Sequence, residues 1–357
     1  MRVLNLIHFL SGGGAERQLC YLAPELVRMG HDIHIAYIDE GPDKPTLSCV
    51  ALHKLKSYSN YDPRQIAQII WLIKYVKPDI IQTWIQQMDI LGGVAAKLCD
   101  TPLIFREPTS GLDYTQMWKN YIRVKIGSAV STVISNSQGG DEYWRKTIPD
   151  KRRHIISNSL PIDEIEKTKA SLPQEMTKSK EPIVLFVGRM VKKSKRPDLF
   201  LEALDFVGHK KKISGVLCGE GPQRSELEMF RYKHRLTVDV HFTGYLPVTA
   251  IWAIMKKASV FVSLSSYEGC PNAVMEAMVC GCPVVISDIP AHRELLDESC
   301  ALFVNPSNVR QTANAIIQIL DDSEAAKNRA LIAKQKTINW SIAEMARNYE
   351  KVYKKCI

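Results

Sequence analysis

A chain of 357 residues is long for one ordinary domain and sufficient for two, each with its own hydrophobic core. Its apolar content of 45% and charged content of 24% are those of an ordinary globular protein and exclude a disordered chain. The formal net charge of +9 favours anionic partners such as phosphates, nucleic acids or acidic membrane surfaces. Because the sequence has no zinc-finger spacing and no RNP-like aromatic motif, we expect no nucleic-acid partner.

Hydropathy and cysteine usage indicate the compartment. The sequence contains no run of the roughly 18 to 20 apolar residues that cross a bilayer. Its first segment is interrupted by Asn5 and His8 and leads directly into glycines, which argues against a signal peptide. Nine cysteines, an odd number without a Cys-x-x-Cys pair, are typical of reduced thiols, and no further ligands stand at metal spacing around Cys280 and Cys282. We therefore expect a cytoplasmic protein without a metal site.

The chain begins with a βαβ pattern. Residues 3–10 form an apolar strand pattern, Ser11-Gly12-Gly13-Gly14 permits a tight turn into an amphipathic helix, and a second strand pattern follows at 32–38. The loop lacks the full G-x-G-x-x-G fingerprint and an acid at the end of the second strand, which argues against a dehydrogenase. Gly13 and Gly14 suit a close approach of backbone N–H groups to a diphosphate. A tight turn without a ligand is the alternative.

Strand and helix patterns then continue to alternate, with helices predicted at 66–75 and 91–99 and strands at 80–84 and 102–105. Arg106 and Glu107 follow the last of these strands. Because the carboxyl ends of parallel strands face the ligand-binding crevice, we predict that both residues contact an acceptor or stabilise charge. A plain ion pair across the loop is the alternative.

Basic and aromatic residues interleave between 113 and 156, where eight basic residues stand against four acidic ones. Trp118, Tyr121 and Trp144 lie among them. This composition suits a helical surface that binds anionic lipid, with a core helix and a solvated basic face as the alternative. Residues 164–181, rich in Lys, Ser and Pro without apolar periodicity, are the best candidate for a linker.

The most informative stretch lies in the last third of the chain. A strand pattern at 258–264 leads into the loop Glu268-Gly269-Cys270-Pro271-Asn272, which opens a helix. Pro271 is tolerated there because the first helical N–H groups have no intrahelical partner, and those free groups suit an anion or a sugar hydroxyl. Glu268 and Glu276 would both line one crevice and accept hydrogen bonds from hydroxyl groups. Alternatively, Glu268 favours the helix start electrostatically and Glu276 is solvated.

The two acids, separated by seven residues and followed at the first acid by Gly-Cys-Pro-Asn, resemble the E-x7-E signature of retaining family 4 glycosyltransferases. Gly13-Gly14-Ala15-Glu16-Arg17 is similar to the first glycine loop of that family, and Val187-Gly188-Arg189 followed by lysines is similar to its diphosphate-binding element. The resemblance implies the GT-B fold, an α/β architecture of two doubly wound Rossmann-like domains with parallel sheets that face each other across a cleft. We expect an acceptor-side domain at 1–165, with a helix at 340–357 packing back on it, and a donor-binding domain at 166–339.

The resemblance also implies site residues. Arg189, Lys195 and Glu268 would be catalytic. The two cations would neutralise the charge that grows on the leaving phosphate, and Glu268 would hold hydroxyls of the donor sugar. Lys193 or Arg196 could take the place of Lys195. Alternatively, these lysines form a solvated surface cluster that binds no ligand. The further donor-binding residues would be Gly13, Gly14, Gly244, Tyr245, Gly269, Cys270, Pro271, Asn272 and Glu276, the last on the ribose hydroxyls.

The resemblance therefore implies a retaining, metal-independent glycosyltransferase of cell-surface polysaccharide or glycolipid synthesis. Its donor would be a UDP- or GDP-linked sugar, which is a substrate, so no cofactor is expected. Its acceptor would be a lipid-linked glycan, reached peripherally at the inner face of the cell membrane. A sugar-nucleotide epimerase or phosphorylase of the same fold and a non-catalytic nucleotide-sugar-binding protein are the alternatives.

Overall fold

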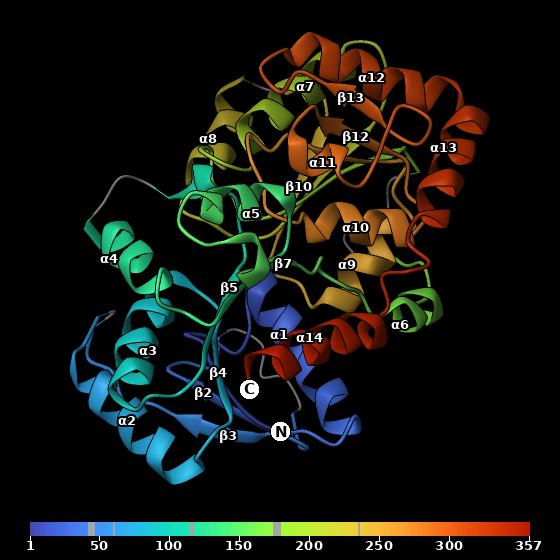
Figure 1. Ribbon diagram of the computed structural model, residues 1–357. Coiled ribbons are helices and arrows are strands. Elements are labelled where there is room, and N and C mark those ends of the chain that lie inside the picture. Colours follow the sequence, from blue (N-terminus) through green and yellow to red (C-terminus); the bar gives the residue numbers. More distant parts are fainter. Residues whose placement is uncertain (42–46, 60, 115–117, 174–179, 235) are drawn as a thin grey trace. The chain divides into compact units, whose positions relative to one another are not determined.

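The protein consists of two compact units. A computed structural model describes residues 1–41, 47–59, 61–114, 118–173, 180–234 and 236–357 (Figure 1). Unit 1 comprises Met1–Leu160 together with Trp340–Ile357, and unit 2 comprises Pro161–Asn339. The division between the units thus falls after Leu160, whereas the sequence analysis placed it after residue 165. None of the helices in the described part of the chain has the length and hydropathy of a membrane-spanning segment.

Unit 1 is built on a seven-stranded parallel sheet with the strand order β3-β2-β1-β4-β5-β6-β7. Its strands are β1 (Arg2–Leu6), β2 (Asp32–Tyr37), β3 (Ala51–Lys54), β4 (Ile80–Thr83), β5 (Leu103–Glu107), β6 (Thr132–Ser135) and β7 (Arg153–Ile155). The chain moves outward from β1 in one direction to β3 and in the other to β7. The strand order therefore reverses between β1 and β4, which is where open α/β sheets bind ligands.

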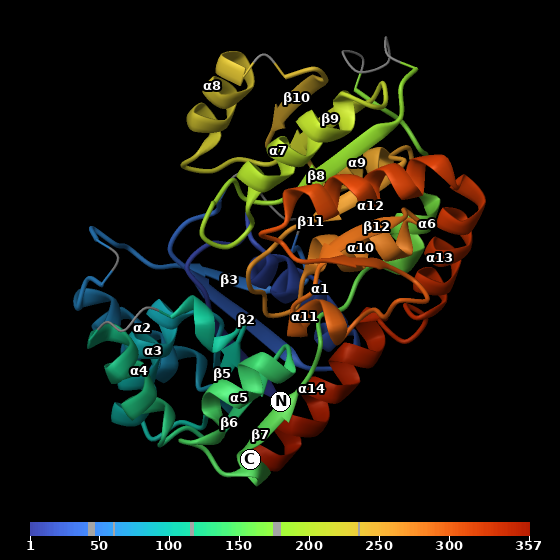
Figure 2. The ribbon, with the colours of Figure 1, turned by 90° about the horizontal axis from the view of Figure 1, so that it is seen from above.

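Helices cover both faces of this sheet (Figures 1 and 2). Leu4 and Leu6 of β1 pack toward α2 and α3, whereas Val3 and Ile7 pack toward α1 and α14, as the two-residue period of a strand requires. The helices are α1 (Gly14–Arg28), α2 (Arg64–Val76), α3 (Gln86–Leu98), α4 (Trp118–Gly127), α5 (Gln138–Arg145) and α14 (Ile342–Cys356), with the 3-10 turns η1 (Gly111–Asp113) and η2 (Asp150–Arg152).

Unit 2 has a six-stranded parallel sheet with the order β10-β9-β8-β11-β12-β13. Its strands are β8 (Ile183–Val187), β9 (Ser214–Cys218), β10 (Asp239–Gly244), β11 (Val260–Ser263), β12 (Val284–Ser287) and β13 (Leu302–Val304). Here the order reverses between β8 and β11. The two doubly wound parallel sheets confirm the α/β architecture predicted from the sequence.

One face of the second sheet packs on α7 and α12 through Leu204, Ile316 and Ile319. Figure 1 shows α9 and α10 on the other side of this sheet. The helices of unit 2 are α6 (Ile162–Lys167), α7 (Pro197–Gly208), α8 (Arg224–His234), α9 (Val248–Met255), α10 (Asn272–Val279), α11 (Pro290–Arg293), α12 (Val309–Asp321) and α13 (Ser323–Gln335).

The linker prediction at 164–181 is wrong in its first part. Residues up to Lys167 belong to the short helix α6, and Ile165 is fully buried. Lys256 Nζ donates hydrogen bonds to the carbonyl oxygens of Glu166 and Thr168, at 2.9 and 2.8 Å, which ties the segment to unit 2. A helix this short shows too little periodicity for recognition in the sequence. Residues 174–179 lie outside the described part of the chain.

Candidate functional site

The predicted donor-binding residues of unit 2 follow strands that end at the same edge of its sheet. Arg189 comes after β8, Tyr245 after β10 and Glu268 after β11. Since all strands are parallel, their carboxyl ends lie together, and β8 and β11 are the two strands between which the order reverses. The fold therefore brings residues from three separate segments to one ligand-binding edge.

The turn that carries Arg189 is held by backbone contacts. The N–H groups of Gly188 and Met190 donate to the carbonyl oxygens of Cys218 and Glu220, at 3.0 and 2.9 Å. Gly219 has a φ of +133°, and a Cβ atom there would lie 2.1 Å from the carbonyl oxygen of Gly188, so only glycine fits. The Arg189 side chain is exposed, and its guanidinium has no hydrogen bond or ion pair with any described residue. An exposed cation thus lies on a turn that is held by backbone hydrogen bonds.

Lys195 and Glu268 form the central contact of the site. Lys195 Nζ is hydrogen-bonded to Glu268 Oε1, and the Ser265 hydroxyl donates to the same oxygen at 2.6 Å. The side chain of Glu268 is 12% exposed and that of Lys195 is 29% exposed. Burial by itself would raise the pKa of Glu268, but the charge of Lys195 and the two hydrogen bonds outweigh burial and lower it. Glu268 is therefore an ionised carboxylate at neutral pH.

The neighbouring cations contact Asp198 or are exposed. Arg196 has a left-handed backbone with a φ of +52°, and its guanidinium contacts Asp198 at 3.2 Å. Lys192 Nζ lies 3.9 Å from the same carboxylate, and Lys193 is exposed. In addition, the N–H of Ser266 donates to the carbonyl oxygen of Ser194 at 2.8 Å, which joins the two loops beside Lys195. Of the three candidates for the diphosphate lysine, the geometry favours Lys195.

Glu276 lies inside α10, the helix that the Glu268 loop opens. Its side chain is buried, so the alternative of a solvated surface acid is wrong. Asn272 is the first residue of α10 and Pro271 precedes it, as the sequence predicted for this helix start. The segment Gly269-Cys270-Pro271-Asn272 thus connects the two acids.

Gly244 ends β10 at the same edge and has a φ of +72°. A Cβ atom on Gly244 would lie 2.8 Å from Glu220 Oε1 and 2.9 Å from Arg224 Nη1, so a larger residue would displace this ion pair. Tyr245 follows and is exposed. Within the described ranges, no group of three or more His, Cys, Asp or Glu side chains is arranged to hold a metal ion.

In unit 1, the predicted glycines lie at the start of α1. Gly13 is the residue before the helix, with its carbonyl oxygen accepting from the N–H of Arg17 at 3.2 Å, and Gly14 is the first helical residue. Gly12 has a φ of +107°, a conformation that favours glycine. The loop therefore follows β1, at the carboxyl edge of the first sheet.

Arg106 and Glu107 are both buried in unit 1. Arg106 donates to the Asn158 side chain and, at 3.4 Å, to the Tyr349 hydroxyl of α14. Glu107 Oε2 accepts from Arg123 Nη2 at 2.8 Å. Glu107 does form an ion pair, as the alternative predicted, but its partner is Arg123 of α4 and not the adjacent Arg106. These contacts favour a structural role over the predicted acceptor contact.

Asp89 completes a buried charge group that the sequence analysis missed. Asp89 Oδ2 accepts from Arg123 Nε at 2.7 Å, and neither side chain is exposed. Burial raises the pKa of Asp89 to about 6, even though the charge of Arg123 and the hydrogen bonds from Thr83 and Arg123 lower it. The only signal in the sequence is an acid inside a helix of small and apolar residues. Its polar partners come from other elements and are not visible there.

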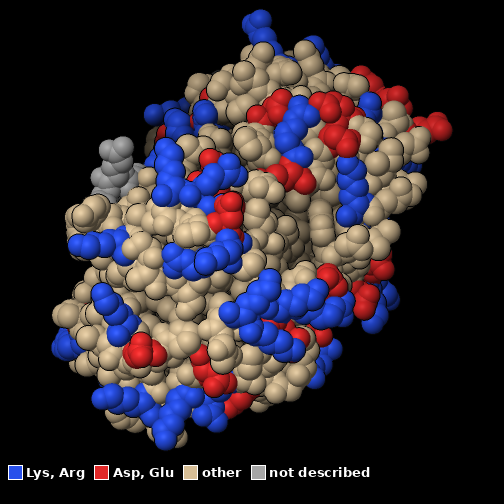
Figure 3. All heavy atoms as spheres, in the orientation of Figure 1, with Lys and Arg blue, Asp and Glu red and all other residues tan. Residues whose placement is uncertain are grey.

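The basic-aromatic surface predicted between 113 and 156 is present in part. Trp118 and Tyr121 of α4 are exposed, whereas Trp144 and Arg123 are fully buried. A second exposed aromatic pair lies on α2, where Trp71 and Tyr75 are stacked with their ring centroids 5.2 Å apart. Figure 3 shows Lys and Arg side chains scattered over broad uncharged areas where α2, α3 and α4 lie.

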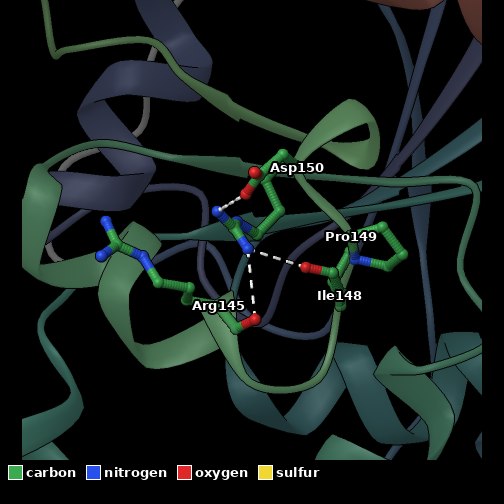
Figure 4. Close-up of a pocket in the computed structure, with 5 residues that line it drawn as sticks. Arg145, Ile148, Pro149 and Asp150 are labelled. Atoms are coloured by element: carbon green, nitrogen blue, oxygen red, sulfur yellow. Dashed lines mark hydrogen bonds and ion pairs between the residues drawn. The ribbon is translucent and has the colours of Figure 1, made fainter.

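A pocket of about 620 Å³ in unit 1 contains none of the predicted site residues (Figure 4). It is lined by Arg145, Ile148, Pro149, Asp150 and Arg153. The Arg153 guanidinium donates to the carbonyl oxygens of Ile148 and Arg145, at 2.7 and 3.3 Å. It therefore hydrogen-bonds the C-terminal end of α5 and the residues that follow it. In Figure 4 the Arg145 side chain points away from Asp150. The pocket is therefore not the candidate site.

Two parallel-sheet Rossmann-like units, with cations and a mostly buried acid at a carboxyl edge of the second sheet, define an α/β protein of the GT-B fold. Residues 12–164 match the family model described as Glycosyltransferase Family 4, and residues 168–336 match the model described as Glycosyl transferases group 1. The chain therefore carries the two domains of GT4-like glycosyltransferases.

Individual relatives are distant. The chain is 25% identical over 215 residues to alpha-D-kanosaminyltransferase of Streptomyces kanamyceticus, covering 58% of this chain and 55% of the relative. It is 23% identical over 282 residues to UDP-Gal:alpha-D-GlcNAc-diphosphoundecaprenol alpha-1,3-galactosyltransferase of Escherichia coli, covering 73% and 71%. The chain thus spans little more than half the length of the first curated relative that it matches. Among solved structures, Anabaena Alr3699/HepE in complex with UDP and glucose has a TM-score of 0.88 at 19% identity, covering 99% and 100% of the chains.

Proposed function

We propose that the protein is a retaining glycosyltransferase that moves a sugar from a nucleotide diphosphate donor to a glycan acceptor. The contact between Lys195 and Glu268, together with the exposed guanidinium of Arg189 in the same loop, carries this proposal. A fixed carboxylate suits the hydroxyls of a sugar, and two cations suit the diphosphate to which the sugar is attached. The matches to two glycosyltransferase family models support it.

In this proposal each site residue has a separate role in donor binding or catalysis. Arg189 and Lys195 neutralise the charge that grows on the diphosphate as the glycosidic bond breaks, without a metal ion. Glu268 accepts hydrogen bonds from hydroxyls of a donor sugar whose transition state is oxocarbenium-like. Glu276 holds the ribose hydroxyls, and the backbone of Gly269 to Asn272 contributes N–H groups at the start of α10. Retention of the anomeric configuration rests on the resemblance of the Glu268–Glu276 spacing to the E-x7-E signature.

UDP is the first nucleotide to test. One solved relative, Alr3699/HepE, is described in complex with UDP-glucose, and one curated relative is a UDP-Gal transferase. Thermal unfolding with UDP, GDP and ADP would show the preference, because a ligand at 100 times its Kd stabilises a protein by about 2.7 kcal/mol. We expect a shift with UDP or GDP that is lost in Arg189→Ala and retained in Lys193→Ala, its exposed neighbour. The absence of any shift would contradict the proposal.

For the acceptor we propose a lipid-linked glycan at the inner face of the cell membrane, with the protein bound peripherally. The exposed aromatic residues Trp71, Tyr75, Trp118 and Tyr121, on helices that also carry lysines, support this assignment. So does the Escherichia coli relative, whose acceptor is alpha-D-GlcNAc-diphosphoundecaprenol. Transfer of radiolabelled sugar to an extracted lipid fraction tests it, and release of free sugar without an acceptor would instead favour an epimerase or hydrolytic activity.

A further inference from the structure

A line of buried hydrogen bonds runs behind Glu268. The Ser265 hydroxyl donates to Glu268 Oε1 at 2.6 Å, and the Ser287 hydroxyl donates to the carbonyl oxygen of Ser265 at 2.6 Å. His292 Nδ1 lies 2.8 Å from the carbonyl oxygen of Ser287 and 3.3 Å from its hydroxyl. Ser265 follows β11, Ser287 ends β12, and His292 belongs to α11. The contacts thus link the loop after β11, the end of β12 and α11 to the carboxylate.

The partners determine the tautomer of His292. A carbonyl oxygen only accepts hydrogen bonds, so Nδ1 carries the proton and donates to Ser287. Burial lowers the pKa of His292, although the hydrogen bond to the Ser287 backbone and the charge of Glu268 oppose this effect. The imidazole is therefore neutral at pH 7, with a lone pair on Nε2.

His292 is an unusual residue at its position. The side chain is fully buried, and its Nε2 atom has no hydrogen-bond partner among the residues that the structure describes. Buried polar atoms in proteins are normally paired, so an exception needs a reason. An apolar residue would fill the same space without leaving Nε2 unpaired, but it would not hold Ser287.

We infer that His292 is a positioning residue for Glu268: it fixes the end of β12 through Ser287, so that Ser287 holds Ser265 and Ser265 holds the carboxylate against Lys195. The inference rests on the proposed function, in which Glu268 contacts the donor sugar. Loss of the Nδ1 donor would remove the hydrogen bond to the Ser287 carbonyl oxygen and the 3.3 Å contact with its hydroxyl, and would weaken the support of Ser265. Binding of the donor sugar would weaken, whereas binding of the nucleotide would be unchanged.

Two substitutions separate positioning from simple packing. Asn places an amide N–H close to where His292 Nδ1–H lies, so His292→Asn retains the donor, whereas His292→Leu retains bulk and loses it. Calorimetric titration with UDP and with UDP-glucose measures the nucleotide and sugar ends of the site. We expect His292→Leu and Ser287→Ala to raise the Kd for UDP-glucose about tenfold, the size of one lost hydrogen bond to a charged group, with the Kd for UDP within about twofold. His292→Asn should remain within about threefold for both.

The exposed His209 of the same unit supplies a matched control, since His209→Leu should change neither Kd. Equal losses for UDP and UDP-glucose in His292→Leu, or no rescue by Asn, would overturn the inference. If the wild-type protein binds neither UDP nor UDP-glucose, the proposed function fails, and the link between His292 and Glu268 is tested without a ligand. The thermal unfolding midpoints of His292→Leu, Glu268→Gln and the double variant provide this test. Non-additive shifts would support the link, and additive shifts would show that the two residues act independently.

Discussion

Lys195 and Glu268 are 73 residues apart in the sequence and share a hydrogen bond at the point where the strand order of the unit 2 sheet reverses. Their contact pairs a cation from the loop after β8 with an acid from the loop after β11. Burial raises the pKa of this mostly buried carboxyl, and the charge of Lys195 is the largest of the effects that lower it. The lysine therefore has a second effect besides any contact with a diphosphate, and this effect can be measured.

Replacing Lys195 by Ala should raise the pKa of Glu268, because burial then acts without the opposing charge. In the wild type the pKa of Glu268 lies below its ordinary value. The pair with Lys195 therefore stabilises the folded protein above the pKa that Glu268 has in the unfolded chain. This stabilisation is lost as the pH falls through the pKa of Glu268 in the folded protein. The acid limb of the pH–rate profile should move to higher pH in Lys195→Ala, with transfer reduced about 100-fold at pH 7.5. Lys193→Ala should leave both unchanged, and an unmoved acid limb in Lys195→Ala would contradict this account.

The buried Asp89 should make the stability of the protein fall with rising pH. The pKa of Asp89 is raised to about 6 from an ordinary value of 3.8. Its favourable contribution to the free energy of unfolding is therefore complete below the pKa of the unfolded chain, and it is lost as the pH rises through 6. The full shift corresponds to roughly 3 kcal/mol, most of which is lost between pH 4 and pH 7. Urea unfolding of wild type and Asp89→Asn across this range measures it. Asn does not titrate, so the two curves should diverge in slope, and parallel curves would show that Asp89 does not titrate here.

Gly219 should tolerate no side chain. In Gly219→Ala the Cβ atom would meet the carbonyl oxygen of Gly188 in the turn before Arg189, and the backbone has a positive φ as well. Gly281 has a φ of +68° with open space around it, so Gly281→Ala separates backbone strain from the clash. We expect a loss of about 1 kcal/mol for Gly281→Ala with normal nucleotide binding. Gly219→Ala should lose more stability and also weaken nucleotide affinity, as measured by urea unfolding and titration with UDP. Equal effects would indicate that the contact with Gly188 is unimportant.

Binding to anionic vesicles should depend on the aromatic residues of α2 and α4. Vesicles that contain phosphatidylglycerol should sediment the wild type at low salt, and binding should weaken as salt rises. The double variants Trp71→Ala/Tyr75→Ala and Trp118→Ala/Tyr121→Ala should bind several-fold less tightly. Tyr232→Ala, which removes an exposed aromatic of α8 in unit 2, is the control and should bind normally. If all three variants bind like the wild type, these helices do not form the membrane surface.

Local patterns in the sequence predicted the alternation of strands and helices and the elements that carry the unit 2 site, whereas the two-domain architecture followed from the resemblance to family 4 glycosyltransferases. The strands were recognisable because a strand buried on both faces has a nearly continuous apolar sequence. The helix that begins after Pro271 was predicted from the same local signals. These features depend on residues that are close together along the chain, where short-range backbone preferences and periodicity act.

The tertiary structure alone decided which polar residues meet. Arg196 has the same charge as Lys195, but its left-handed backbone and its contact with Asp198 direct it elsewhere. Glu107 ends a strand at a ligand-binding edge, yet it is paired with Arg123, and Asp89 joins them from α3. Likewise, the hydrogen bonds between His292 and Glu268 run through two serines at the ends of adjacent strands. A charge or hydrogen bond acts over a few ångströms in space, and no spacing along the chain encodes that distance when the partners lie on different elements.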